Sequence, residues 1–462
     1  MEARAVREPC LAPPPPPPRG LAGALLPRPA VVMAALRMLL VALPMLAYKT
    51  LLPLRVLELV DGDTAVADAW LSKILSTASA CTLVTTCWLC AASDDAGRRR
   101  GLLIVCGGAV ADGVGCALAP SCRALTWLHA GAQALGSAWA LLALSFANVA
   151  DVLRDSTARE RAVDFAFVES SMYAAVLVAP ALSGIAAQRL GTARAFLIAA
   201  GFAGLSLLAV AAMDEAAFRP APARAGREPW SLAWLFWRSP LGALAHFAET
   251  RERLVVGAAC FSHWLAMRGY EFLLPLVCKG LFHMDSAQQG AIGSFLGAGA
   301  IASSVVLVRV IKGDDVALFK QFAAVGAVGL GLVAASGVVN ARRVVAFVAG
   351  SAFYAAEAPA NPALRGMVVG LRGDDGLGFA LGAAAVLETL SLFAASLAFA
   401  PIYKALPGTT AFLAAAAVMV SSVLLVVCFA PAPSKNRPAA ATPDYAPLNG
   451  DAGEAAPPHA LA

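Results

Sequence analysis

The stretch Ser-Asp-Asp-Ala-Gly-Arg-Arg-Arg at residues 93–100 separates two long apolar segments, residues 68–91 and 101–119. Because a glycine permits a tight turn, the two segments are predicted to be antiparallel helices. Each is long enough to cross the hydrocarbon core of a bilayer, which takes about 20 apolar residues. The charged turn then lies at the membrane surface, where its acids and arginines pair with each other or with a neighbouring helix end.

The composition of the whole chain supports a membrane protein. Of the 462 residues, 59% are hydrophobic and 14% are charged, whereas soluble proteins average about 45–50% and about 25%. These values exclude an ordinary soluble enzyme and a disordered chain. A formal net charge of +5 does not indicate nucleic-acid binding, because the basic residues cluster in short loops. We therefore expect a polytopic protein whose partner is the lipid bilayer.

Apolar segments of similar length recur along the chain, six before residue 214 and six after residue 253. The predicted spans are 35–56, 68–91, 101–119, 124–149, 162–187, 193–213, 254–278, 287–310, 317–338, 343–363, 376–402 and 407–430. The predicted domains are a disordered proline-rich tail (1–32), an N-terminal bundle (33–213), a linker (214–253), a C-terminal bundle (254–431) and a second disordered tail (432–462).

The distribution of cations predicts the orientation. If the N-terminus is cytosolic, most lysines and arginines fall in cytosolic loops, as the positive-inside rule requires. The even number of spans then places both termini in the cytosol. We expect the protein to be a monomer.

Three sequence motifs resemble those of a known family. Asp-x-x-Gly-Arg-Arg at 94–99 resembles the D-R-x-G-R-R loop motif of the major facilitator superfamily, with Asp95 in place of the usual basic residue. The segments 146–152, 159–161 and 179–184 resemble the "AYxAD…ER…GPxxGG" pattern of the tetracycline/proton antiporter-like and hippocampus-abundant-transcript-like branch. The segment 359–365 is similar to the end of the tenth span in that family.

The resemblance implies an all-α membrane protein with the major facilitator fold, twelve transmembrane helices in two six-helix bundles. In that fold, spans one, four, seven and ten line a central cavity. The resemblance and the turn together predict a cytosolic latch, made of Asp94, Gly97, Arg98, Arg99, Asp151 and Arg161.

Polar and ionisable side chains within the spans are the candidates for a substrate and proton cavity. An ionised residue at mid-bilayer costs about 2.5–3.5 kcal/mol even on the mildest scale, so it should face a cavity or find a partner. The candidates are Lys49, Asn148, Glu169, His263, Arg268, Glu271, Glu357, Asn361 and Glu388.

Several ionisable side chains within the spans have a structural alternative. Arg268 and Glu271 lie three residues apart on one helical face and are expected to neutralise one another. Glu169, Glu357 and Glu388 either bind and release protons or form a hydrogen bond to a neighbouring helix. His129 is expected to reach the surface from the end of its span.

The chain shows no sequence signature of an enzyme or a cofactor site. It has no Gly-Lys dipeptide, hence no P-loop, and no His-Glu-x-x-His motif. The cysteine pair at 87 and 90 lies in an apolar segment without a second pair, so we expect no catalytic residues, cofactor or metal.

The leading hypothesis is therefore a secondary active transporter of a small organic solute working by alternating access, with proton coupling as the preferred variant. The alternative is a transport-silent sensor or trafficking partner that keeps the transporter fold. The segment Tyr445-Ala446-Pro447-Leu448 fits a sorting signal and suits either hypothesis.

Overall fold

The computed structural model describes residues 28–153, 157–213, 232–284, 286–311, 313–337, 343–371, 376–406 and 408–429. In these ranges the chain is helical apart from short turns, and they contain no β-strand. The Tyr445 motif lies outside the described residues.

Six spans form the N-terminal bundle. They are α2 (Pro29–Leu59), α3 (Thr64–Ala96), α4 (Arg98–Leu118), α5 (Cys122–Gly136) with α6 (Ala138–Val152), α7 (Ala158–Leu190) and α8 (Thr192–Ala212). The fourth span is divided at Ser137, whose backbone is extended. The Ser137 side chain accepts a hydrogen bond from the backbone N–H of Ala140, so it caps α6.

Six further spans form the C-terminal bundle. They are α11 (Arg251–Gly280), α12 (Ser286–Ala302) with the π-helical turn η2 (Ser303–Leu307) and α13 (Val308–Val310), α14 (Asp315–Ala335), α15 (Arg343–Ala355) with α16 (Ala360–Gly370), α17 (Leu377–Ala405), and the turn η3 (Gly408–Ala411) with α18 (Phe412–Phe429). The tenth span is interrupted between α15 and α16, where Pro359 cannot donate a backbone hydrogen bond.

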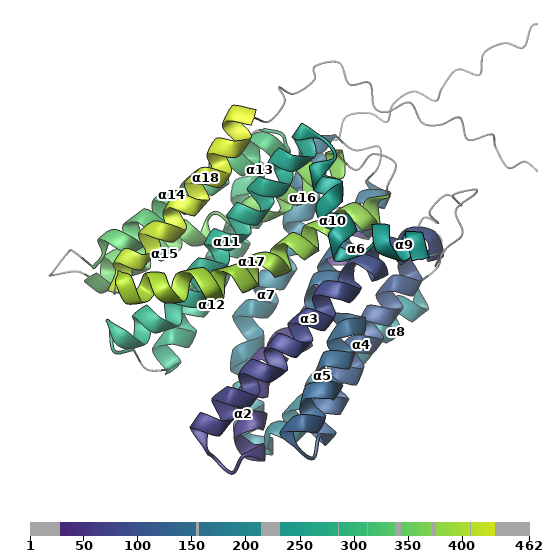
Figure 1. Cartoon of the computed structure of the whole chain (residues 1–462), viewed down its shortest axis with the longest axis vertical. Helices are drawn as coiled ribbons and strands as arrows, with labels where there is room; N and C mark the ends of the chain where they lie inside the picture. Colours follow the sequence, from purple (N-terminus) through teal and green to yellow (C-terminus); the bar gives the residue numbers. More distant parts are fainter. Residues whose placement is uncertain are drawn as a thin grey trace, which may run out of the picture.

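Within the described residues, ten helical stretches are long and apolar enough to cross a membrane. The polar α11 and the interrupted pair α15–α16 complete the twelve spans of the fold. Figure 1 shows the two bundles, the first in purple and blue and the second in green and yellow.

The predicted tail and linker differ from the structure at their edges. Residues 29–32, assigned to the first tail, form the first turn of α2, since Pro29 suits the start of a helix. The linker contains two short helices, α9 (Leu232–Trp237) and α10 (Pro240–Ala248), and α11 begins within it at Arg251. The backbone N–H of Gly242 bonds the side chain of Ser239, which starts α10.

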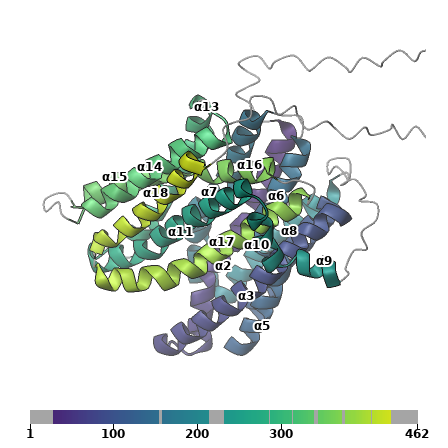
Figure 2. The same ribbon diagram turned by 45° about the horizontal axis from the view of Figure 1, so that its top comes forward.

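The two bundles meet chiefly where α17 packs against α3 and α6 and where α7 packs against α12 and α16. Helix α10 packs against α17, α11 and α3 at one end of the molecule, which we call the linker face. Figures 1 and 2 show α3 and α17 lying together near α10 and diverging towards their other ends, which point to the opposite face.

Candidate functional site

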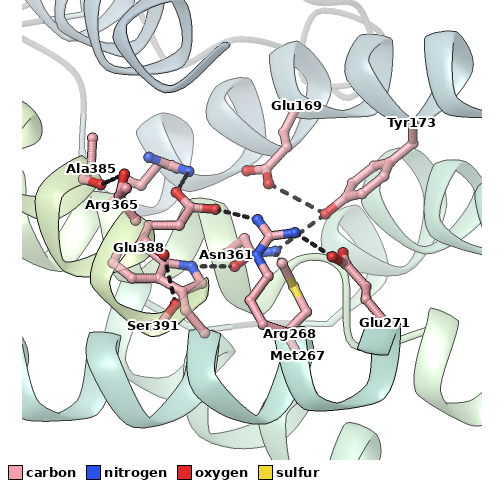
Figure 3. A network of polar contacts seen from close by, with 12 residues as sticks. Glu169, Tyr173, Met267, Arg268, Glu271, Asn361, Arg365, Ala385, Glu388 and Ser391 are labelled. Carbon is pink, nitrogen blue, oxygen red and sulfur yellow. Dashed lines mark hydrogen bonds and ion pairs between the residues drawn. The ribbon is translucent and has the colours of Figure 1, made fainter. Parts of the chain in front are cut away.

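The centre of the molecule holds a network of ion pairs in the C-terminal bundle. Arg268 on α11 donates to Glu388 Oε1 on α17 at 3.0 Å, and Arg365 on α16 donates to Glu388 Oε2 at 2.9 Å. Arg268 also donates to Glu271 Oε2 at 2.6 Å. One carboxylate is therefore shared by two buried arginines, as Figure 3 shows.

Aromatic rings of the N-terminal bundle cover these arginines. The guanidinium carbon of Arg268 lies 4.8 Å from the ring centroid of Trp139, and that of Arg365 lies 5.1 Å from the ring centroid of Phe146. Both rings belong to α6. An arginine over an aromatic face is attracted by the ring quadrupole, so α6 stabilises the two cations without supplying a counter-charge.

A second chain of hydrogen bonds crosses between the bundles. Trp264 on α11 donates to Asn361 Oδ1 at 2.9 Å, and Asn361 Nδ2 donates to the hydroxyl of Tyr173 on α7 at 3.3 Å. The Tyr173 hydroxyl in turn donates to Glu169 Oε1 at 3.3 Å. The other oxygen, Glu169 Oε2, is buried without a hydrogen-bond partner.

The exposed fraction of the side chains changes along the site. Along α11, Trp264 is 0% exposed and Arg268 is 6% exposed, while the side chain of Glu271 is 51% exposed. Lys49 on α2 is also exposed, and it is near enough to Glu271 for their charges to interact. Because Glu271 lies further along α11 from the linker face than Trp264, the exposed end of the site is towards the opposite face.

Three other predicted candidates lie apart from the ion-pair network. His263 Nε2 and Glu357 Oε2 approach each other within 3.2 Å, and both side chains are buried. The ring of Phe319 packs edge-on against His263. Asn148 is buried on α6, and its side-chain oxygen has no hydrogen-bond partner.

The predicted latch residues form a charged cluster at the linker face. Arg98 pairs with Asp94 at 2.6 Å and with Asp151 at 2.9 Å. The two oxygens of Asp94 accept hydrogen bonds from the backbone N–H groups of Gly378 and Phe379, both at 2.9 Å. A carboxylate at a helix N-terminus is favoured by the helix dipole, so Asp94 ties α3 to the start of α17. We call Asp94, Arg98, Asp151 and this first turn of α17 the linker-face clasp.

The remaining latch residues extend the contacts at this face. Gly97 adopts a φ of +97°, a backbone conformation that residues with a side chain rarely adopt, between α3 and α4. Arg99 donates to the carbonyl of Ala211 at the end of α8. Arg161 on α7 pairs with Asp315 at the start of α14 at 3.2 Å, which is a second link between the bundles.

Sequence reasoning missed Arg365, Trp139 and Tyr173 as site residues. Arg365 was assigned to a loop because the tenth span was expected to end at residue 363, but α16 continues to Gly370. The sequence signal for Arg365 is its position at the end of the segment 359–365, which is similar to the end of the tenth span in the family. The expectation that His129 reaches the surface was wrong: its ring is buried and contacts Asp112 on α4.

Solved structures of transporters share this fold. The human organic anion transporter MFSD10 (TETRAN) is 20% identical, with a TM-score of 0.72 over 86% of this chain and 100% of that chain. The proton:xylose symporter XylE is 15% identical, with a TM-score of 0.67 over 87% of this chain and 95% of that chain. The E. coli fucose:proton symporter FucP is 13% identical, with a TM-score of 0.66 over 87% and 99%.

Sequence comparison gives the family directly. No curated protein matches the chain. The profile of the Major Facilitator Superfamily matches residues 29–354, which is more than half of the chain and includes the latch motif and most of the central site. The chain thus belongs to the major facilitator superfamily and is an integral, multi-pass secondary transporter rather than an enzyme.

Proposed function

We propose that the protein transports a small organic anion through the passage between the bundles. The observation that carries the proposal is the sharing of Glu388 by Arg268 and Arg365. Even with Glu271 as a second partner of Arg268, three nitrogens of the two guanidinium groups have no hydrogen-bond partner: Arg268 Nε, Arg365 Nε and a terminal nitrogen of Arg365. Arginine donors are suited to planar carboxylate ligands.

The exposed end of the site supports the same class of solute. The exposed carboxylate of Glu271 pairs with Arg268 on its own helix and is near enough to Lys49 of the other bundle for their charges to interact. A solute carboxylate entering from the opposite face replaces Glu271 as the partner of Arg268. The relative MFSD10, described as an organic anion transporter, adds weight to this choice.

We propose that Glu169 couples proton movement to this transport. Its free oxygen is buried roughly a third of the way along α7 and has no hydrogen-bond partner, while Tyr173 already donates to the other oxygen. The hydrogen bonds from Asn361 to Tyr173 and from Tyr173 to Glu169 connect α16 to α7. Movement of α7 against α16 therefore changes the surroundings of the Glu169 carboxyl group, which then gains or loses a proton.

The orientation proposed from the sequence places the linker face in the cytosol. Arginines concentrate at this face, as the positive-inside rule requires of a cytosolic surface; they include Arg98, Arg99, Arg100, Arg159, Arg161, Arg251, Arg253 and Arg309. Both termini are then cytosolic. The contacts of the linker-face clasp correspond to a state that is closed to the cytosol and open to the other side, one of the two states of an alternating-access cycle.

Flux in proteoliposomes tests the proposal. Purified protein is reconstituted, and the uptake of labelled mono- and dicarboxylates is compared with that of neutral sugars and organic cations, each with and without a pH gradient. We expect the protein to take up carboxylates, and we expect a pH gradient to accelerate this uptake. Uptake of only neutral or cationic solutes would refute the anion proposal, and no flux of any solute would favour the transport-silent alternative.

Two substitutions separate substrate binding from proton coupling. Glu169→Gln is expected to retain anion exchange but to lose its dependence on the pH gradient. Arg268→Lys keeps the charge but loses the two-pronged donor, so it is expected to raise KM at least tenfold. Glu160→Gln on the same helix as Glu169 is the matched control, because glutamine also serves at this capping position.

The buried pair of His263 and Glu357 is the alternative proton site. If Glu357→Gln removes the response to the pH gradient and Glu169→Gln does not, coupling belongs to that pair and the role proposed for Glu169 is wrong.

A further inference from the structure

A second polar cluster lies inside the N-terminal bundle, between α4 and α5, and the transport steps proposed above do not use it. Asp112 and Cys116 are one turn apart on α4, and His129 and Gln133 are one turn apart on α5. Residues four apart share one helical face. Each helix therefore presents a pair of polar side chains to the other helix.

The side-chain atoms of the cluster converge on one carboxylate oxygen. His129 Nδ1 lies 2.7 Å from Asp112 Oδ1, and Cys116 Sγ lies 3.3 Å from the same oxygen. The thiol sulfur and His129 Nδ1 are 3.9 Å apart. Gln133 Nε2 donates to the other oxygen, Asp112 Oδ2, at 2.7 Å.

The separations of the three side-chain atoms can be compared with those around a tetrahedral metal ion. Zinc binds nitrogen and oxygen at about 2.0–2.1 Å and sulfur at about 2.3 Å, so its ligand atoms lie roughly 3.3–3.6 Å apart. The two separations that involve the Cys116 sulfur, 3.3 and 3.9 Å, are close to that range. His129 Nδ1 and Asp112 Oδ1, 2.7 Å apart, are joined by a direct hydrogen bond, so metal binding replaces that bond and moves the two atoms about 0.6 Å further apart.

A cluster that only forms structural hydrogen bonds does not need this combination of residue types. A buried Asp–His–Gln set satisfies its own polar atoms without a thiol. Cys116 nevertheless directs its sulfur at the carboxylate, and its side chain is 0% exposed. Thiolate, imidazole and carboxylate together are zinc ligands. The bond from Gln133 to the second oxygen is the kind of outer contact that orients a ligating carboxylate.

Close packing of the two helices holds the cluster in place. Gly108 on α4 faces Gly136 on α5 so closely that a Cβ at Gly108 would lie 2.5 Å from the Gly136 nitrogen. Tyr48 on α2 donates to the carbonyl of Ala109 at 2.9 Å, next to the cluster. Because the backbones are in contact, the distance between the two side-chain pairs is fixed, and little ordering is needed on binding.

The cluster lies nearer to the opposite face than to the linker face. His129 lies seven residues into α5, which begins at the opposite face, so it is roughly 10 Å deep at 1.5 Å per residue. Asp112, Cys116 and His129 are buried, and Gln133, one turn deeper on α5, is partly exposed. An ion from the opposite face therefore has the shorter path to the cluster.

We propose that Asp112, Cys116 and His129 bind one zinc-class divalent cation, with Gln133 orienting the carboxylate. Cys116 binds as the thiolate and releases its proton to solvent, and His129 binds through Nδ1. The ion links α4 to α5 within the N-terminal bundle and takes no part in the central anion site. Zinc arriving from the opposite face thus stabilises the bundle on which the other bundle rocks.

Metal binding to the purified full-length protein tests the proposal. Zn²⁺ is titrated into protein stripped with chelator, and bound metal is counted after gel filtration; Cd²⁺ serves as a second probe because its thiolate complex absorbs in the ultraviolet. We expect one equivalent of tightly bound Zn²⁺, a Cd²⁺–thiolate band and a rise in Tm that increases with Zn²⁺ concentration. These three readouts use the wild-type chain, so they do not depend on the folding of a variant.

Variants then assign the ligands. Cys116→Ser is expected to abolish the Cd²⁺ band and weaken Zn²⁺ binding at least tenfold, and His129→Gln to weaken Zn²⁺ binding similarly. Gln133→Leu should weaken it about 10- to 100-fold. Cys106→Ser, a buried cysteine on α4 that contacts Ser206, is the matched control and should bind normally. Absence of stoichiometric binding by the wild type would overturn the proposal, and so would equal losses in Cys106→Ser and Cys116→Ser.

Discussion

Neutralising Asp94 should release the closure of the transporter at the linker face. Asp94→Asn keeps the size of the side chain but removes the charge that pairs with Arg98 and faces the N-terminus of α17. A hydrogen bond to a charged group contributes about 1.5–3 kcal/mol, and a carboxylate at a helix N-terminus about 0.3–2 kcal/mol. The amide oxygen of asparagine keeps part of both interactions. We therefore expect the substitution to destabilise the closed state relative to the open state by about 2–3 kcal/mol.

That loss converts into a measurable change in population. At 1.4 kcal/mol per factor of ten, 2–3 kcal/mol raises the fraction of molecules open at the linker face by about 30- to 150-fold while the open state remains minor. Cys90 is a native probe of this opening, because it is fully buried on α3. It is covered by α17, where a Cβ added to Gly382 would lie 2.7 Å from the Cβ of Cys90. Separation of α3 from α17 exposes its thiol.

The assay is the rate of maleimide labelling at each cysteine, resolved by mass spectrometry. We expect Asp94→Asn to accelerate labelling of Cys90 by the factor above, and the exposed neighbour Asp95→Asn to leave it unchanged. Cys106, buried between α4 and α8 of the N-terminal bundle, reports unfolding, because rocking of the bundles does not separate it from Ser206 on α8. An unchanged rate at Cys90 in Asp94→Asn would show that the clasp does not hold this face closed.

Three further predictions concern stability. Glu388→Gln leaves two buried arginines without their shared counter-charge, so thermal unfolding should show a loss of stability of about 3–5 kcal/mol. Glu271→Gln, at a half-exposed position, should lose less than about 1 kcal/mol of stability. Equal losses would contradict the shared-carboxylate geometry. Gly108→Ala drives a methyl group into the backbone of α5 and should cost about 1–3 kcal/mol, while Gly107→Ala, where a Cβ meets no atom within 4 Å, should be neutral or stabilising. Trp139→Leu removes a cation–π contact between the bundles and should raise thiol labelling at the linker face by about 2- to 30-fold, the equivalent of about 0.5–2 kcal/mol; an unaltered rate would mean that this ring does not stabilise the closed state.

The fold was predictable from the sequence because membrane insertion depends on local composition. Every apolar run of about 20 residues must span the bilayer with its backbone hydrogen bonds satisfied inside the helix. The breaks in the spans were not predictable in the same way. Ser137 divides the fourth span although the apolar sequence continues across it, and the tenth span bends before Pro359 and then continues.

The candidate site could be predicted only where its contacts are local. Arg268 and Glu271 pair at a spacing of three residues, as the sequence indicates. The partner that matters more, Glu388, lies 120 residues away from Arg268, and no local pattern connects the two. Arg365 and Trp139 enter the site through the approach of other helices, so composition and spacing contain no direct signal of their role.

The division of contacts between the bundles explains how the transporter can move at low energetic cost. The strong buried ion pairs, Arg268–Glu388–Arg365, lie wholly within the C-terminal bundle. Around the central site the contacts across the interface include cation–π contacts to α6, the neutral hydrogen bond between Asn361 and Tyr173, and the attraction between Lys49 and the half-exposed Glu271. Separating them costs about 0.5–2 kcal/mol each, whereas breaking a buried ion pair costs about 3–5 kcal/mol. The stronger closing interaction is therefore assigned to the linker-face clasp at the membrane surface, where water replaces the lost hydrogen bonds as the bundles rock apart.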